Sequence, residues 1–192
     1  MKNIKLTLLC FLFLNASCAQ KDNSIVSPSE KNYEIVNVYK DVDIPWSIEF
    51  LDENTIIYAE KKGEIYIVKN NTAVKVENVP EVYFRGQGGL LDLELHPDFK
   101  NNNLIYMSYA SGSREQGGGN TAVARAKLID NTLTDIEVLY KGEENSTKGQ
   151  HYGSRLQFDK DGFLFFTIGD RGNRDQNPQN LELDGGKVYR IH

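Results

Sequence analysis

The chain has 192 residues and a formal net charge of −5. It contains no basic run or stripe, so nucleic acid is not expected as a partner. Its two cysteines, Cys10 and Cys18, both lie near the N-terminus, so the body of the chain contains no disulfide.

The first 18 residues have the pattern of a bacterial export signal. Lys2 and Lys5 form a short positive region, and the apolar run at 4–14 is too short to span a bilayer. Two small residues then precede Cys18, which predicts a lipoprotein-type signal over 1–18 with Cys18 as the lipidated first residue. An ordinary secretory signal, cleaved near Ala19, is the alternative.

Residues 19–32 are polar and are predicted to be a flexible tether, followed by a domain over 33–192. Loss of Lys2 and Lys5 with the signal takes the net charge from −5 to −7. The predicted location is the periplasm or the cell envelope, and the only predicted contact with a membrane is the lipid anchor. The oligomeric state is left open.

The domain repeats one pattern in three units, at 45–70, 88–130 and 153–192. Each unit contains three short runs rich in β-branched and aromatic residues, separated by turns rich in Asp, Asn and Gly. The predicted strands are 48–50, 56–59 and 64–68, then 91–95, 104–109 and 122–128, then 156–158, 163–168 and 187–191. Repeated groups of antiparallel strands predict an all-β propeller with one small sheet per unit. A β-sandwich is the alternative.

More residues separate the start of the third unit from the start of the second than separate the start of the second from the start of the first. Two insertions, 112–120 (GSREQGGGN) and 141–150, are expected to account for the difference as long loops. Such loops at one rim of a scaffold are common positions for functional residues.

The number of units is low for a closed propeller. The smallest closed propellers have about four blades, whereas this chain shows two complete blades and part of a third. We therefore expect a fragment of a longer protein. An isolated piece would leave an apolar flank and an unpaired strand edge, which is an aggregation hazard. A short protein that closes by oligomerising is the alternative.

His151 and Asp170 are the candidate catalytic residues. His151 lies just before the strands of the third unit, and Asp170 follows the run 163–168 in a Gly-Asp turn. A histidine beside a carboxylate is a common arrangement for a general base, because the carboxylate sets the tautomer of the imidazole. A surface histidine and a turn-forming aspartate are the alternative.

Two long motifs carry a resemblance to a known family. GQGGLLDLELHPDFKNNNLIYMSY, at 86–109, and HYGSRLQFDKDGFLFFTIGDRGN, at 151–173, resemble the soluble PQQ-dependent sugar dehydrogenases, also called glucose/sorbosone dehydrogenases. The resemblance covers nearly all of 33–192. It implies a six-bladed β-propeller of which about the first three blades are present. It also implies the cofactor pyrroloquinoline quinone (PQQ), calcium, oxidation of an aldose sugar to its lactone, and an electron acceptor that the sequence does not identify.

The resemblance also assigns roles to residues. His151 is the implied general base and lies at the cofactor, Asp170 orients it, and Gln87 lies beside the quinone and the sugar. The calcium ligands and the basic residues that bind the quinone carboxylates are implied in later blades. Gln150 and the short loops favour the broader aldose dehydrogenase branch over a glucose-specific enzyme.

Two other functions remain open at this stage. A non-catalytic exported β-propeller lipoprotein could bind carbohydrate or protein, but it would not need His151, Asp170 and Gln87 together. A calcium-dependent lactonase would need converging acidic and Asn ligands, and the sequence offers no such set.

Three other polar positions are predicted to be structural. His96 is expected in a turn, and Arg155 is expected to pair with an acid between blades. The segment 159–162 (DKDG) could be a small calcium loop, but a tight hairpin turn is the favoured interpretation.

Overall fold

The computed structural model describes residues 34–143 and 145–192. Contacts divide the chain into two units, Met1–Val36 and Asn37–His192, and every described strand belongs to the second unit. The predicted signal at 1–18, the lipidation site Cys18 and the tether at 19–32 lie outside the described residues and stay predictions.

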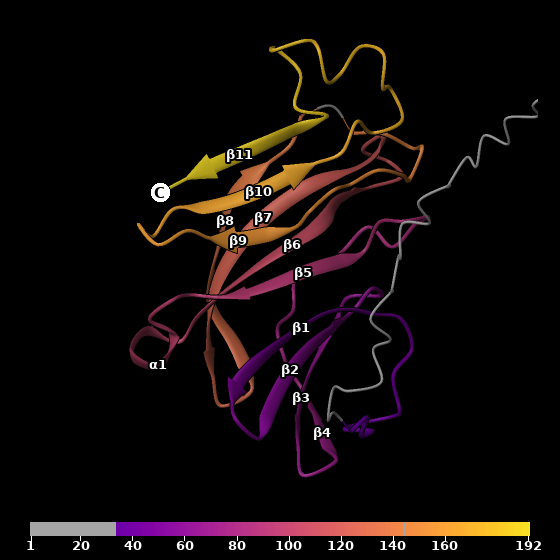
Figure 1. The fold of residues 1–192 in the computed structure, drawn as a ribbon. Helices are drawn as coiled ribbons and strands as arrows, with labels where there is room; N and C mark the ends of the chain where they lie inside the picture. Colours follow the sequence, from indigo (N-terminus) through magenta and orange to yellow (C-terminus); the bar gives the residue numbers. More distant parts are fainter. Residues whose placement is uncertain (1–33, 144) are drawn as a thin grey trace, which may run out of the picture. The chain divides into compact units, whose positions relative to one another are not determined.

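The second unit consists of three antiparallel sheets, each formed by strands that follow one another along the chain (Figure 1). The first sheet contains β1 (Pro45–Asp52), β2 (Thr55–Glu60), β3 (Glu64–Lys69) and β4 (Thr72–Lys75). The second contains β5 (Leu90–Leu95), β6 (Leu104–Ser113), β7 (Gly118–Ile129) and β8 (Thr132–Lys141). The third contains β9 (Leu156–Phe158), β10 (Leu164–Ile168) and β11 (Lys187–Ile191). One helical turn, α1 (Phe99–Asn102), is the only helix among the described residues, so the all-β prediction is confirmed.

The structure adds two strands and corrects one loop. The fourth strands β4 and β8 were not predicted. Three of the four residues of β4 and five of the ten residues of β8 are exposed, so neither run has the mostly buried apolar pattern of a core strand. The predicted loop at 112–120 is wrong for most of its length, because β6 and β7 continue as a hairpin to the pair Ser113 and Gly118. Gly112 has a φ of 127° and faces the carbonyl of Gly118 so closely that a Cβ would collide with it. The glycines of this segment therefore allow a close strand pairing.

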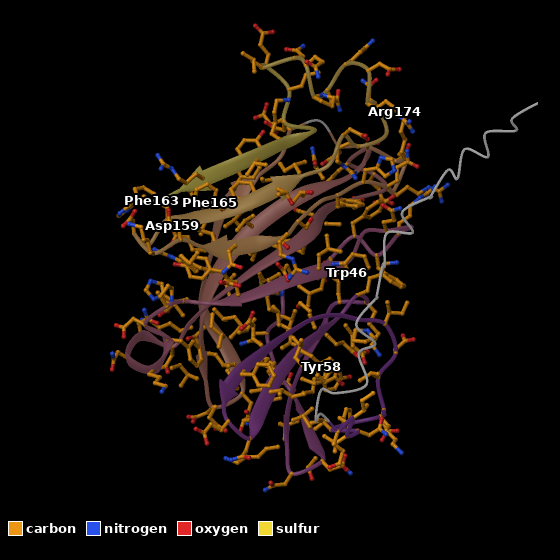
Figure 2. The ribbon with its side chains drawn as sticks, viewed as in Figure 1. Trp46, Tyr58, Asp159, Phe163, Phe165 and Arg174 are labelled. Carbon is orange, nitrogen blue, oxygen red and sulfur yellow. The ribbon has the colours of Figure 1, made fainter. Side chains whose placement is uncertain are left out.

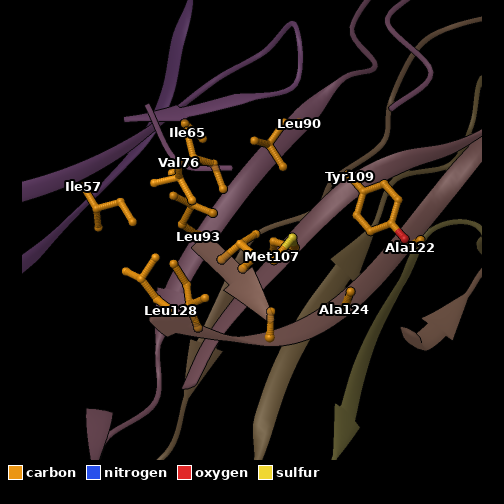
Figure 3. Packing of buried hydrophobic residues seen from close by; sticks show 14 residues of the cluster. Ile57, Ile65, Val76, Leu90, Leu93, Met107, Tyr109, Ala122, Ala124 and Leu128 are labelled. Atoms are coloured by element: carbon orange, nitrogen blue, oxygen red, sulfur yellow. The ribbon is translucent and has the colours of Figure 1, made fainter. Parts of the chain in front are cut away.

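A continuous apolar layer joins the first and second sheets (Figure 3). Ile57 and Ile65 from the first sheet pack with Leu90, Leu93 and Met107 from the second, and all five are almost completely buried. Burial of one such side chain contributes roughly 1.5–3 kcal/mol relative to exposure. The first two sheets are therefore held together mainly by this layer.

A second cluster joins the second and third sheets. Leu164, Phe166 and Ile168 of β10 point toward the second sheet and are buried. Phe165 and Thr167, which alternate with them, point to the opposite face of the third sheet. Figure 2 labels Phe165 on this sheet.

The first strands of the three sheets, β1, β5 and β9, lie next to one another. β9 is the edge strand of its sheet, and its outward N–H groups donate hydrogen bonds to carboxylates of β5. Leu156 N donates to Asp92 at 2.7 Å, and Phe158 N donates to Glu94 at 3.4 Å. Arg155 Nη1 also donates to Asp92, at 2.8 Å, so the predicted pairing of Arg155 with an acid between blades is confirmed.

Glu49 of β1 belongs to the same acidic group. Burial, and then the charges of Glu94 and Asp92, raise its pKa to about 7, although Arg155 opposes the shift. The folded state thus binds this proton more tightly than the unfolded state, whose ordinary value is 4.5. We expect the free energy of unfolding to decrease as the pH rises from the unfolded value through about 7, and then to level off.

The substitution Glu49→Gln should flatten this pH dependence, measured as urea midpoints at about pH 5 and about pH 8. Part of the slope should remain, because burial also raises the pKa values of Asp92 and Glu94. The substitution Glu53→Gln, in the exposed turn after β1, is the matched control. An unchanged slope in the Glu49 variant would exclude Glu49 as its source.

The other two predicted structural positions have local partners. His96 Nδ1 accepts hydrogen bonds from Asp98 N at 3.0 Å and from Asn102 Nδ2 at 2.8 Å. Asp159 Oδ1 accepts the N–H groups of Asp161 and Phe163, both at 2.9 Å, which confirms the tight hairpin turn at 159–162. Asp159 and Phe163 lie at the end of the third sheet opposite Arg174 (Figure 2).

Candidate active site

His151 and Asp170 form a direct pair at the end of the third sheet. His151 Nδ1 lies 2.7 Å from Asp170 Oδ1, which also accepts the N–H of Gly172 at 2.7 Å. The hydrogen bond to His151, followed by that from Gly172, holds the pKa of Asp170 below its usual value. Asp170 is therefore a carboxylate at neutral pH, and His151 Nδ1 carries the proton that it accepts. The side chain of His151 is 40% exposed.

The backbone of the third sheet brings these two residues together. β9 and β10 pair as a hairpin, and Ser154 N donates to Thr167 O at 2.6 Å just beyond their last pair. The chain before β9 thus passes beside the chain after β10, and Gly169 touches the backbone of His151. A Cβ at Gly169 would collide with the His151 carbonyl, so this close approach requires glycine. His151 itself has a φ of 54°, a left-handed conformation that is uncommon for residues other than glycine.

Gln87 reaches the same place from the loop before β5. Its Oε1 accepts the N–H of His151 at 2.7 Å, and its own N–H donates to Gly149 O at 2.8 Å. A Cβ on the adjacent Gly88 would lie 2.8 Å from the hydroxyl end of Tyr152, so the loop and the ring are in contact. The structure therefore brings Gln87, His151 and Asp170 into one cluster, and their roles in a site stay predictions.

Buried hydroxyl groups of the second sheet hold the segment around His151. Thr121 Oγ1 donates to Tyr152 O at 2.8 Å, and Ser108 Oγ donates to Ser154 O at 2.6 Å. Both hydroxyl residues are completely buried. Sequence reasoning missed them, although a polar residue inside an apolar strand run is a signal that could have identified them.

Arg171 is a further residue that sequence reasoning missed. Its guanidinium is buried, with Nη2 donating to Gly119 O at 2.8 Å and Nη1 donating to Gln150 O. It also stacks over the ring of Tyr152, with 3.6 Å between Cζ and the ring centroid. Arg171 therefore contacts both chain neighbours of His151.

Comparison with known proteins identifies the family of this fold and site. The family model described as Glucose / Sorbosone dehydrogenase matches residues 42–192. The chain belongs to the glucose/sorbosone dehydrogenase family. The three sheets are blades of the propeller fold of this family, with about three blades present, as predicted.

Two curated members of the family are similar in sequence. The chain is 31% identical over 170 residues to aldose sugar dehydrogenase YliI of Escherichia coli, covering 86% of this chain and 45% of the relative. It is 28% identical over 191 residues to quinoprotein glucose dehydrogenase B of Acinetobacter calcoaceticus, covering 84% of this chain and 40% of the relative. The chain thus spans less than half the length of either relative.

Solved structures of the family show the same fold. The soluble aldose sugar dehydrogenase of Escherichia coli, in its apo form, superimposes with a TM-score of 0.73 at 32% identity, over 80% of this chain and 45% of that one. The PQQ-bound aldose sugar dehydrogenase of Streptomyces coelicolor superimposes with a TM-score of 0.72 at 22% identity, over 82% of this chain and 47% of that one. At 22% identity, the similarity to the Streptomyces coelicolor enzyme shows a shared fold alone.

The described residues were also searched for a metal-binding cluster and for a membrane-spanning helix. Over 34–143 and 145–192, no group of three or more His, Cys, Asp or Glu side chains is placed to hold a metal ion. In the same ranges, no helix is long and apolar enough to cross a membrane.

Proposed function

We propose that this chain contributes the general base of a PQQ-dependent dehydrogenase that oxidises an aldose sugar to its lactone. The observation that carries the proposal is the pair of His151 and Asp170, in which the carboxylate holds Nδ1 at 2.7 Å, so that Nε2 is the ring nitrogen left to act on a substrate. The family relationship provides the reaction class.

The proposed chemistry begins with the sugar hydroxyl at the anomeric carbon. An alcohol is a very weak acid, so its proton must leave as the carbon is oxidised, and Nε2 of His151 accepts it. The ordinary pKa of imidazole, near 6.5, suits this transfer at neutral pH. The carboxylate of Asp170 then stabilises the resulting imidazolium. PQQ, when bound, supplies the two-electron oxidant that takes up the hydride.

The donor set of the cluster fits a quinone and a sugar. Gln87 already uses its carbonyl oxygen to accept the N–H of His151, so its amide NH2 is the group that it can offer to a ligand. An amide donor suits the carbonyl oxygens of a quinone or the hydroxyls of a sugar. His151 and Gln87 are therefore the residues of this chain that would contact the cofactor. Calcium belongs to the proposal through the family resemblance alone.

A cavity of about 210 Å³ is lined in part by Asn177, whose Nδ2 donates to Asp170 O at 2.9 Å. Its lining includes the polar side chains of Lys148, Asn173 and Asn177 and the carboxylates of Glu143 and Asp184. Amide and ammonium groups of this kind can donate to the hydroxyls of a sugar. This lining supports a carbohydrate as the substrate class.

The proposal is tested with the protein expressed from its complete gene, supplied with PQQ and calcium. We expect aldose-dependent reduction of an artificial electron-accepting dye, and loss of this activity when PQQ is omitted. Sugar binding without dye reduction, in protein shown to bind PQQ, would contradict the proposal and favour a non-catalytic exported propeller. Globomycin-sensitive processing would separately test the lipid anchor at Cys18.

A further inference from the structure

We propose that Arg171 is a positioning residue that fixes Gln87, His151 and Asp170 relative to one another. The inference rests on the function proposed above, and it assigns to Arg171 no contact with substrate or cofactor. It is argued from three contacts of its guanidinium group, which is buried with 5% of the residue exposed.

The first two contacts fix the chain before His151. Nη1 donates to the carbonyl of Gln150, and Nη2 donates to the carbonyl of Gly119 on β7. The rigid guanidinium fork thus ties the residue preceding His151 to a strand of the second sheet. A flexible ammonium group would hold two such acceptors with less geometric definition.

The third contact fixes the chain after His151. The guanidinium lies over the ring of Tyr152, 3.6 Å from its centroid. The hydroxyl end of the same ring packs against Gly88, the neighbour of Gln87. Arg171 therefore reaches the Gln87 loop through Tyr152, and Gln87 in turn accepts the N–H of His151.

The position of Arg171 in the chain completes the arrangement. It directly follows Asp170 and has a φ of 55°, so its own backbone adopts the same uncommon left-handed conformation as His151. Among the described residues, no carboxylate lies within ion-pair distance of Arg171. Two backbone carbonyls and an aromatic face are its partners, and two of these three, Gln150 and Tyr152, are the chain neighbours of His151. A role limited to holding an ion pair between blades is thereby excluded.

The test uses the substitutions Arg171→Met and Arg171→Lys in the protein expressed from its complete gene. The readout is the tautomer of His151, followed by NMR of ¹⁵N-labelled histidine, with the signal assigned through its loss in His151→Asn. In the wild-type protein we expect a single tautomer protonated at Nδ1. Both Arg171 variants should lose this uniform signal, and their kcat should decrease roughly 10- to 100-fold with little change in KM.

The matched control is Arg155→Met, which also removes an arginine contact between the second and third sheets. Its His151 signal and kcat should stay as in the wild-type protein. If Arg171→Met does not fold, Arg171→Lys alone decides, since it keeps the charge and most of the volume. A wild-type His151 signal in a folded Arg171→Lys protein would overturn the proposal. Because the NMR readout requires no turnover, failure of the proposed dehydrogenase function would be recognised separately, as an ordered His151 without activity.

Discussion

Replacing His151 with asparagine should lower the rate of aldose oxidation by about 100- to 10,000-fold, the usual contribution of a general base. Asparagine is chosen because it tolerates the left-handed backbone at this position, where φ is 54°. Its amide can also donate to Asp170 in place of Nδ1. What the variant lacks is Nε2, the atom that accepts the proton in the proposed reaction.

The matched control is His96→Asn. His96 Nδ1 accepts two hydrogen bonds in its turn, and the carbonyl oxygen of asparagine can accept the same donors. Activity is measured as aldose-dependent dye reduction at saturating PQQ, and folding is measured as the thermal midpoint. We expect the control to keep wild-type activity. Wild-type activity in a folded His151→Asn protein would remove His151 from the role of base, whatever the activity of the control.

The first three strands of each blade could be predicted because their information is local. In β10, for example, the alternation of Leu164, Phe166 and Ile168 with Phe165 and Thr167 marks one buried face within a few residues of chain. The glycine-rich segment at 112–120 could not be interpreted in this way. Glycine is typical of loops, and only the close pairing of β6 with β7 explains why it occurs within strands here.

In the candidate site, too, local features could be predicted from the sequence and contacts between distant segments could not. His151 and Asp170 could be found because they belong to one motif and are brought together by one hairpin. Thr121 and Arg171 were missed because their partners are backbone carbonyls, at Tyr152 and Gly119, that lie 31 and 52 residues away in the chain. A backbone acceptor leaves no residue type for a motif to show. A polar residue such as Thr121 can therefore stand out in a strand run, but its partner becomes visible only in the folded structure.

The carboxylate of Asp92 should matter more for stability than any exposed ion pair of this unit. It is buried, and it accepts the N–H of Leu156 at 2.7 Å and the guanidinium of Arg155 at 2.8 Å. Leu156 is itself buried in the layer between the second and third sheets. In an Asp92→Ala protein the N–H of Leu156 would be left without an acceptor away from water, which costs about 1–3 kcal/mol of unfolding free energy.

The comparison that isolates this effect is Arg155→Met, which removes the other partner of Asp92. The side chain of Arg155 is 69% exposed, so solvent screens the pair, and we expect a loss below about 1 kcal/mol. The Asp92 carboxylate keeps the hydrogen bond from Leu156 in that variant. Free energies of unfolding come from urea titrations of the two variants and the wild-type protein under one set of conditions. Equal losses in the two variants would mean that the ion pair, rather than the hydrogen bond to the edge of β9, joins the second blade to the third.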